Sequence, residues 1–80
     1  MATIVTATGK VFESDYFVVL EERSLMFLRV LNTDEKTVRD IFGNSSETSC
    51  IRSGNRIAYG YINLRTIIKE GEAFKVVLSK

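Results

Sequence analysis

Apolar positions come in short runs separated by polar turns, and most of these runs favour β-strands. The runs at 3–8, 11–22 and 25–31 are rich in β-branched, aromatic and aliphatic residues, and Gly9-Lys10 separates the first two. These patterns predict three antiparallel strands in chain order, the first two joined as a hairpin. Further strands are predicted at 48–52 and 56–64, around a loop at 53–55 in which Gly54 and Asn55 can take positive φ. A second hairpin turns at residues 70–72 and ends in a strand over 73–79.

One segment has the pattern of a helix, at about residues 34–42. Thr33 or Asp34 can cap its first turn, and the apolar residues Val38, Ile41 and Phe42 follow at helical spacing. Gly43 is placed to end the helix in a left-handed conformation. A helix this short is unstable alone in water, so its apolar face must pack on the sheet. The prediction is an α+β fold in one domain over residues 1–80: a curved antiparallel sheet or partial barrel of about six strands with this helix.

Composition narrows the classes of function. The net charge of +1 disfavours general nucleic-acid binding, and no apolar run approaches the roughly 20 residues that span a bilayer. The start of the chain lacks the pattern of a secretory signal, and a lone cysteine makes no internal disulfide, so a cytoplasmic protein is expected. A chain of this size has a small hydrophobic core and therefore limited stability. We expect self-association into a homo-oligomer to supply additional stability.

The residues for common catalytic sites are absent. The chain has no histidine, one cysteine and only isolated glycines, so no nucleophile with an activating base, metal site or phosphate loop is predicted, and no cofactor is expected. Cys50 is either a reactive thiol or a small buried strand residue, and burial is the commoner state of free cysteine. Gly60 marks either a bulge or a close approach of another backbone or ligand, or else a bend in the sheet.

A set of basic and aromatic residues is the nearest pattern to a binding site. Aromatic rings stack on bases and arginines pair with phosphates, so such a surface suits a small anionic nucleotide. Tyrosine and arginine also dominate the energetics of many protein interfaces, and the structural alternative is a solvated strand face. The set comprises Arg52, Arg56, Tyr59, Tyr61, Arg65 and Lys69.

The polar stretch at 42–50 is interpreted mainly as a device of the fold rather than a binding loop. Gly43 and Asn44 end the helix, and Thr48 begins the next strand. Glu47 is expected to accept backbone N–H bonds or to pair with Arg52 or Arg56, which would fix how the helix leads into the sheet.

Several short motifs resemble those of small prophage-encoded, β-rich proteins of Gram-positive bacteria. The matching residues are Thr8-Gly9, then Asn44, Glu47 and Thr48, then Gly60-Tyr61, whereas Ser45 replaces a proline and Asn63 or Ile62 a threonine of the pattern. The resemblance implies a phage origin and supplies no site residues. We therefore expect a non-enzymatic phage accessory protein that acts by binding a host or phage protein. The expected role is a counter-defence inhibitor of a host nuclease, another defence component or its nucleotide signal, in the host cytoplasm. The alternative is a minor virion protein of a baseplate, head fibre or connector.

Overall fold

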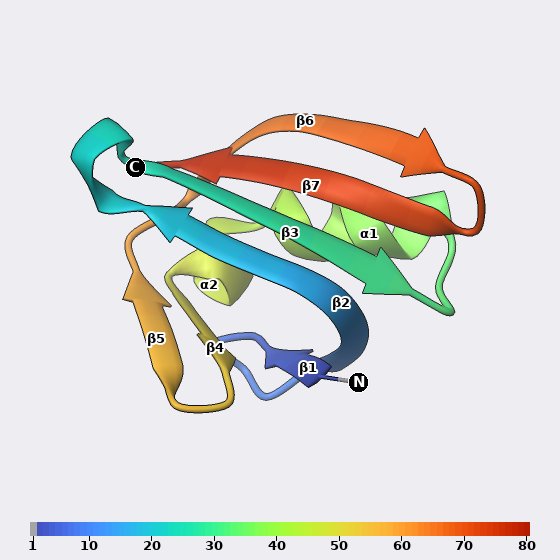
Figure 1. Ribbon diagram of the computed structural model, residues 1–80, viewed down its shortest axis with the longest axis horizontal. Coiled ribbons are helices and arrows are strands. Elements are labelled where there is room, and N and C mark those ends of the chain that lie inside the picture. The colour runs from blue at the N-terminus through green and yellow to red at the C-terminus, as the bar shows by residue number, and fades with distance from the viewer. Residues whose placement is uncertain (1) are drawn as a thin grey trace.

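Seven strands form one antiparallel sheet in the computed structural model, which describes residues 2–80 (Figure 1). The order across the sheet is β5-β4-β1-β2-β3-β7-β6. A 3-10 turn, η1 (Glu21–Arg23), joins β2 to β3, and two helices, α1 (Glu35–Phe42) and α2 (Ser45–Thr48), join β3 to β4. The α+β class and the antiparallel sheet are confirmed, with seven strands in place of about six. The strands are β1 (Ala2–Val5), β2 (Val11–Leu20), β3 (Leu25–Leu31), β4 (Cys50–Ser53), β5 (Arg56–Tyr59), β6 (Asn63–Glu70) and β7 (Ala73–Ser79).

Strand β2 bends and takes part in both halves of the sheet (Figure 1). Its first residues pair with β1, and the register toward β3 shifts between Ser14 and Tyr16, as expected of a β-bulge. The Ser14 hydroxyl donates to the Tyr16 carbonyl at 3.1 Å and accepts from the Tyr16 N–H at 3.3 Å. The bulge also changes which residues face the core: Phe12 before it and Phe17 after it both pack inward. Without the extra residue, strict alternation would point Phe17 outward.

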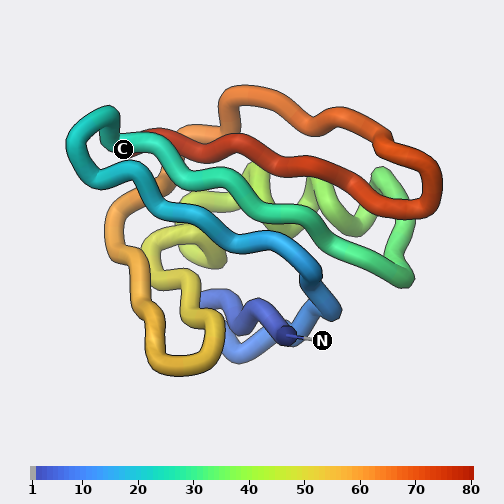
Figure 2. Tube along the Cα trace, in the orientation of Figure 1, coloured from blue at the N-terminus to red at the C-terminus, as the bar shows by residue number. Residues whose placement is uncertain are grey.

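The strand predicted over 56–64 is broken: β5 ends at Tyr59, and residues 63–64 begin β6, which lies at the opposite edge of the sheet. Gly60 lies between them with φ of +82°, a conformation that glycine adopts far more readily than other residues. Figure 2 shows residues 60–62 carrying the chain from one edge to the other. No heavy atom would lie within 4 Å of a Cβ at Gly60, so the glycine serves the bend and not a close approach.

Helix α1 packs as its sequence predicts. The Asp34 carboxylate accepts a hydrogen bond from the Thr37 N–H at 2.8 Å, and Val38 and Phe42 are fully buried while Ile41 is partly buried. The expected left-handed end is wrong, because Gly43 has φ of −83°. A Cβ there would lie 2.6 Å from the Arg39 carbonyl oxygen, so close packing rather than a positive φ favours glycine at this position.

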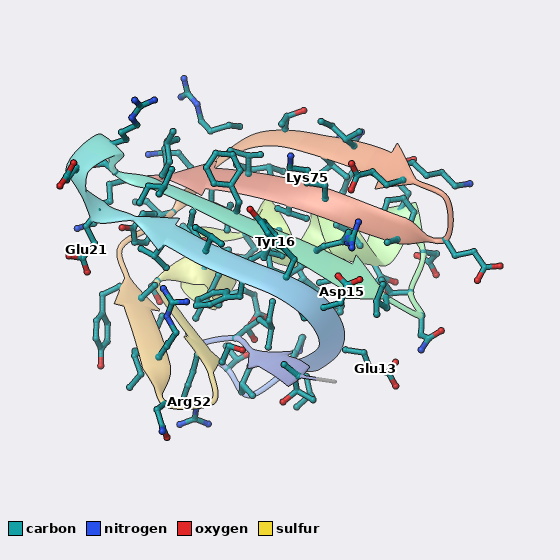
Figure 3. The ribbon with its side chains drawn as sticks, viewed as in Figure 1. Glu13, Asp15, Tyr16, Glu21, Arg52 and Lys75 are labelled. Carbon is teal, nitrogen blue, oxygen red and sulfur yellow. The ribbon has the colours of Figure 1, made fainter. Side chains whose placement is uncertain are left out.

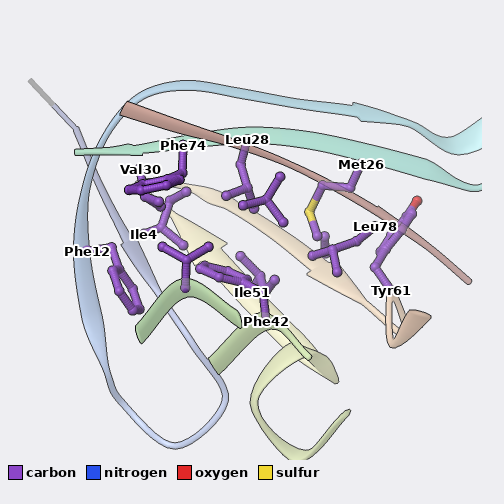
Figure 4. Close-up of a cluster of buried hydrophobic side chains, with 13 residues drawn as sticks. Ile4, Phe12, Met26, Leu28, Val30, Phe42, Ile51, Tyr61, Phe74 and Leu78 are labelled. Carbon is purple, nitrogen blue, oxygen red and sulfur yellow. The ribbon is translucent and has the colours of Figure 1, made fainter. Parts of the chain in front are cut away.

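The core lies between the sheet and the helices (Figure 4). The rings of Phe12 and Phe42 contact each other with centroids 5.3 Å apart, which joins β2 to α1. Side chains from both halves of the sheet meet here, and the sheet is open, with β5 and β6 at its two ends, so it matches the predicted curved sheet and not a partial barrel. The fully buried members include Ile4, Met26, Leu28, Val30, Ile51, Val76 and Leu78.

Candidate binding surface

The polar stretch after α1 forms the short helix α2, where a strand had been expected to begin at Thr48. Asn44 caps this helix, because its side-chain oxygen accepts from the Ser46 N–H at 3.0 Å. Thr48 is fully buried, and its hydroxyl lies 3.4 Å from the Asn44 carbonyl oxygen that accepts from it. Strand β4 then starts two residues later than predicted, at Cys50.

Glu47 ties α2 to the loop between β1 and β2. Its carboxylate accepts hydrogen bonds from the hydroxyls of Thr6, at 2.8 Å, and Thr8, and Lys10 Nζ lies 3.7 Å away. The Glu47 carbonyl also accepts from the Ala7 N–H at 2.9 Å. The expected partners Arg52 and Arg56 were therefore wrong. The Thr8 and Thr6 hydroxyls hold the pKa of Glu47 below its ordinary value, since they favour the charged form of a residue that is only 6% exposed. This geometry supports a structural role for the stretch.

The six basic and aromatic residues singled out in the sequence do not form one surface. Tyr61 is 2% exposed and packs beside Met26 and Leu78 (Figure 4), so its ring is not available to stack on a ligand. Arg65 and Lys69 lie on β6, at the edge of the sheet opposite to β5.

The side chain of Arg56 is engaged by contacts within the protein. Its guanidinium donates to the Phe17 carbonyl at 3.3 Å and lies 5.5 Å from the Phe17 ring centroid, close enough for a cation–π contact. Arg56 also lines a hollow with Glu21 and Glu22. Its guanidinium is therefore already engaged by Phe17.

The remaining two residues, Arg52 and Tyr59, share one face of the β4–β5 hairpin. The register places Val11, Val5, Arg52 and Ile57 side by side across β2, β1, β4 and β5, and pairs Cys50 with Tyr59. Tyr59, Val11 and Ile57 are 63%, 62% and 49% exposed, the largest exposures among the big apolar side chains of the described residues. We call Val11, Arg52, Ile57 and Tyr59 the hairpin patch.

Arg52 stands at the centre of the hairpin patch and projects away from the sheet (Figure 3). Within residues 2–80 no carboxylate lies within 4.0 Å of its guanidinium, and its neighbours in the register are Val5 and Ile57. Sequence analysis selected Arg52 and Tyr59 but missed Val11 and Ile57. Pairing between strands that are distant in the sequence brings these four residues together, so no local sequence pattern indicates the patch.

The outer face of β2, β3, β7 and β6 is a second exposed surface, and its charges are paired internally. Arg29 donates to both oxygens of Asp15, at 2.7 and 2.8 Å, and to Glu70 at 3.4 Å. The hydrogen bonds from Arg29 lower the pKa of Asp15. Tyr16 and Lys75 lie on the same face (Figure 3), and the Lys75 ammonium lies 5.7 Å from the Phe27 ring centroid. Only Lys75 among these charges lacks an acidic partner within the described part of the chain, so this face offers less to a charged ligand than the hairpin patch does.

The described residues 2–80 contain no cluster of three or more side chains suited to hold a metal ion. Cys50 is a free, half-buried thiol on the same face as Tyr59, its partner in the register. None of the helices in this part of the chain is long and apolar enough to cross a membrane. No protein-family model, curated protein or solved structure matches the chain.

Proposed function

We propose that this protein acts by binding another protein through the hairpin patch. The observation that carries the proposal is the grouping of three strongly exposed apolar side chains around an arginine that has no acidic partner among residues 2–80. Tyrosine and arginine flanked by apolar groups are the residue types that contribute most at protein interfaces. Exposed apolar side chains that gather in one place are a common mark of such sites.

The biological setting follows the phage resemblance. We propose a counter-defence inhibitor that binds a host protein in the bacterial cytoplasm and acts by this binding rather than by catalysis. A nucleotide signal is a weaker candidate for the ligand, because the six basic and aromatic residues lie on different parts of the molecule. The virion alternative draws support from a separate observation: within residues 2–80 no strand pairs with the outer side of β5, which suits the joining of copies along that edge.

Two matched variants test the proposal. Ile57 and Ile68 are 49% and 46% exposed on opposite edge strands, so Ile57→Ser and Ile68→Ser remove similar apolar surface from different places. We expect the tagged wild type and Ile68→Ser to retain one stoichiometric protein from a bacterial lysate, and Ile57→Ser to lose it. If Ile57→Ser retains as much of this partner as the wild type does, or if the tagged wild type is recovered with no bound protein, binding through the hairpin patch is refuted. Enrichment of the chain in purified phage particles would favour the virion role.

A further inference from the structure

The backbone of β5 is free on one side. A loop of two residues, Gly54 and Asn55, closes the β4–β5 hairpin, and Gly54 takes the positive φ of +60° that tight hairpin turns require. In such a hairpin the pair that flanks the loop exchanges both hydrogen bonds, and the pairs then alternate along the strands. Arg56 and Ala58 therefore bond to β4, whereas the N–H and C=O groups of Ile57 and Tyr59 point outward from the sheet.

Within residues 2–80 these outward groups have no strand beside them, since β5 is the end of the sheet. The next residue along, Gly60, already donates its N–H to the Ser49 carbonyl at 2.9 Å. An extended segment laid against β5 would thus find two donors and two acceptors, at Ile57 and Tyr59. The side chains of these same two residues belong to the hairpin patch.

The edge of the sheet at β6 has features that hinder pairing with another strand, and the edge at β5 lacks them. Strand β6 has a register shift at Arg65 and carries Lys69 and Glu70, and irregular backbone and charged side chains are devices that keep edge strands from pairing. Strand β5 is regular along its whole length, and apart from Arg56, which is held by Phe17, its residues are uncharged. Only its short length limits pairing, so the side chains must supply part of the affinity.

The charges of the β4–β5 hairpin indicate which kind of segment would bind beside β5. Between Cys50 and Tyr59 the charged residues are two arginines; Arg56 is engaged by Phe17, whereas Arg52 has no hydrogen-bond or acidic partner within residues 2–80. A strand added beside β5 would lie about 10 Å from β4, or two strand spacings. The long side chains of an arginine and a glutamate can meet over that distance. An acidic residue near Arg52, between apolar residues that contact Ile57 and Tyr59, would match the hairpin patch.

We infer that the partner protein presents an extended, acidic segment that adds to the sheet as a strand beside β5. The inference rests on the proposed function and names the form of the partner. Strand addition draws affinity from main-chain hydrogen bonds and specificity from alternate side chains. A second copy of this chain suits the edge less well, because antiparallel self-pairing would bring two arginine-bearing hairpins together with no added acid.

The probe for this inference is a display library of random peptides of about a dozen residues, selected on the immobilised full chain. We expect enrichment of peptides that alternate apolar residues and carry glutamate or aspartate. For an enriched peptide, fluorescence anisotropy should show affinity for Arg52→Glu weakened by more than about tenfold, with loss of affinity as salt is raised. The control Arg65→Glu makes the same charge change on β6 and should bind as the wild type does.

A second pair of variants tests the backbone contacts. Ile57→Pro removes an outward N–H while leaving the bonds to β4 in place, and proline is tolerated on edge strands for that reason. We expect it to lose the peptide, whereas Ile57→Val, which keeps the N–H and a branched side chain, retains it. Since the proline could disturb folding, hydrogen exchange in the wild type gives an independent readout. The Ile57 and Tyr59 amides should exchange fast in the free protein and slowly with peptide, whereas amides of β6 should not change.

Failure of this inference is distinguishable from failure of the proposed function. If no peptide is enriched, or enriched peptides bind regardless of Arg52→Glu and leave the Ile57 and Tyr59 amides unprotected, strand addition is refuted. The lysate experiment with Ile57→Ser would still identify a partner that uses the hairpin patch as a folded surface. Protection of the two amides that rises with protein concentration alone would assign the edge to a second copy and overturn the inference.

Discussion

Replacing Phe42 with alanine should cause one of the largest losses of stability that a single substitution can produce in this chain. The Phe42 ring is fully buried on α1 and contacts Phe12 on β2 at 5.3 Å between centroids. Truncating a buried phenylalanine costs about 3 to 5 kcal/mol, because burial is lost and the cavity collapses only in part. A chain of this length has a free energy of unfolding of roughly 4 to 12 kcal/mol. The variant would therefore be marginally folded.

Urea denaturation followed by far-ultraviolet circular dichroism measures this loss, and the absence of tryptophan makes dichroism preferable to fluorescence. The control is Lys36→Ala, an exposed position on the same helix, which should leave the urea midpoint nearly unchanged. Phe42→Leu should fall between the two, since leucine refills part of the cavity. A loss below about 1 kcal/mol for Phe42→Ala would refute the view that this ring holds α1 on the sheet.

Three further predictions concern single groups. Because Thr8 and Thr6 lower the pKa of Glu47, its charged form contributes stability above the ordinary value of 4.5, and this contribution is lost as the pH falls through the lowered pKa. Thermal melts on acidification should therefore lose more stability in the wild type than in Glu47→Gln; equal slopes would contradict this. Tyr61→Phe should leave the melting temperature unchanged or raise it, since the Tyr61 hydroxyl is buried and has no hydrogen-bond partner among residues 2–80. A marked drop would show that this hydroxyl makes a stabilising hydrogen bond. Gly43→Ala should destabilise by about 1 to 3 kcal/mol in urea denaturation, because its Cβ would crowd the Arg39 carbonyl, and a neutral result would show that α1 relaxes freely.

The elements that sequence analysis predicted well are those set by local chemistry. Strand β3 and helix α1 begin and end close to the predicted residues, because the apolar run at 25–31 and the cap at Asp34 act over a few residues. The turn between β6 and β7 was also placed correctly, since Gly71 takes the positive φ that a two-residue hairpin turn needs.

The features that were missed depend on contacts between distant parts of the chain. The hydroxyl of Thr6 lies 41 positions away from its acceptor Glu47, and nothing near either residue indicates the pairing. The break at Gly60 was not predicted, because a glycine within a β-rich run fits a bulge, a close approach or a bend of a strand that continues. The bulge in β2 is invisible for the same reason: residues 11–20 form one β-prone run whether or not an extra residue is present.

The position of the hairpin patch follows from one property of the topology. Strands β5 and β6 are consecutive in the chain, yet Gly60 sends them to opposite edges, so neither strand covers the free side of the other. The chain protects the β6 edge with a bulge and charges and leaves the β5 edge regular and, apart from Arg56, uncharged. Exposed strand edges carry a risk of aggregation, and because the chain blunts the β6 edge and leaves the β5 edge open, we place the proposed strand addition at β5.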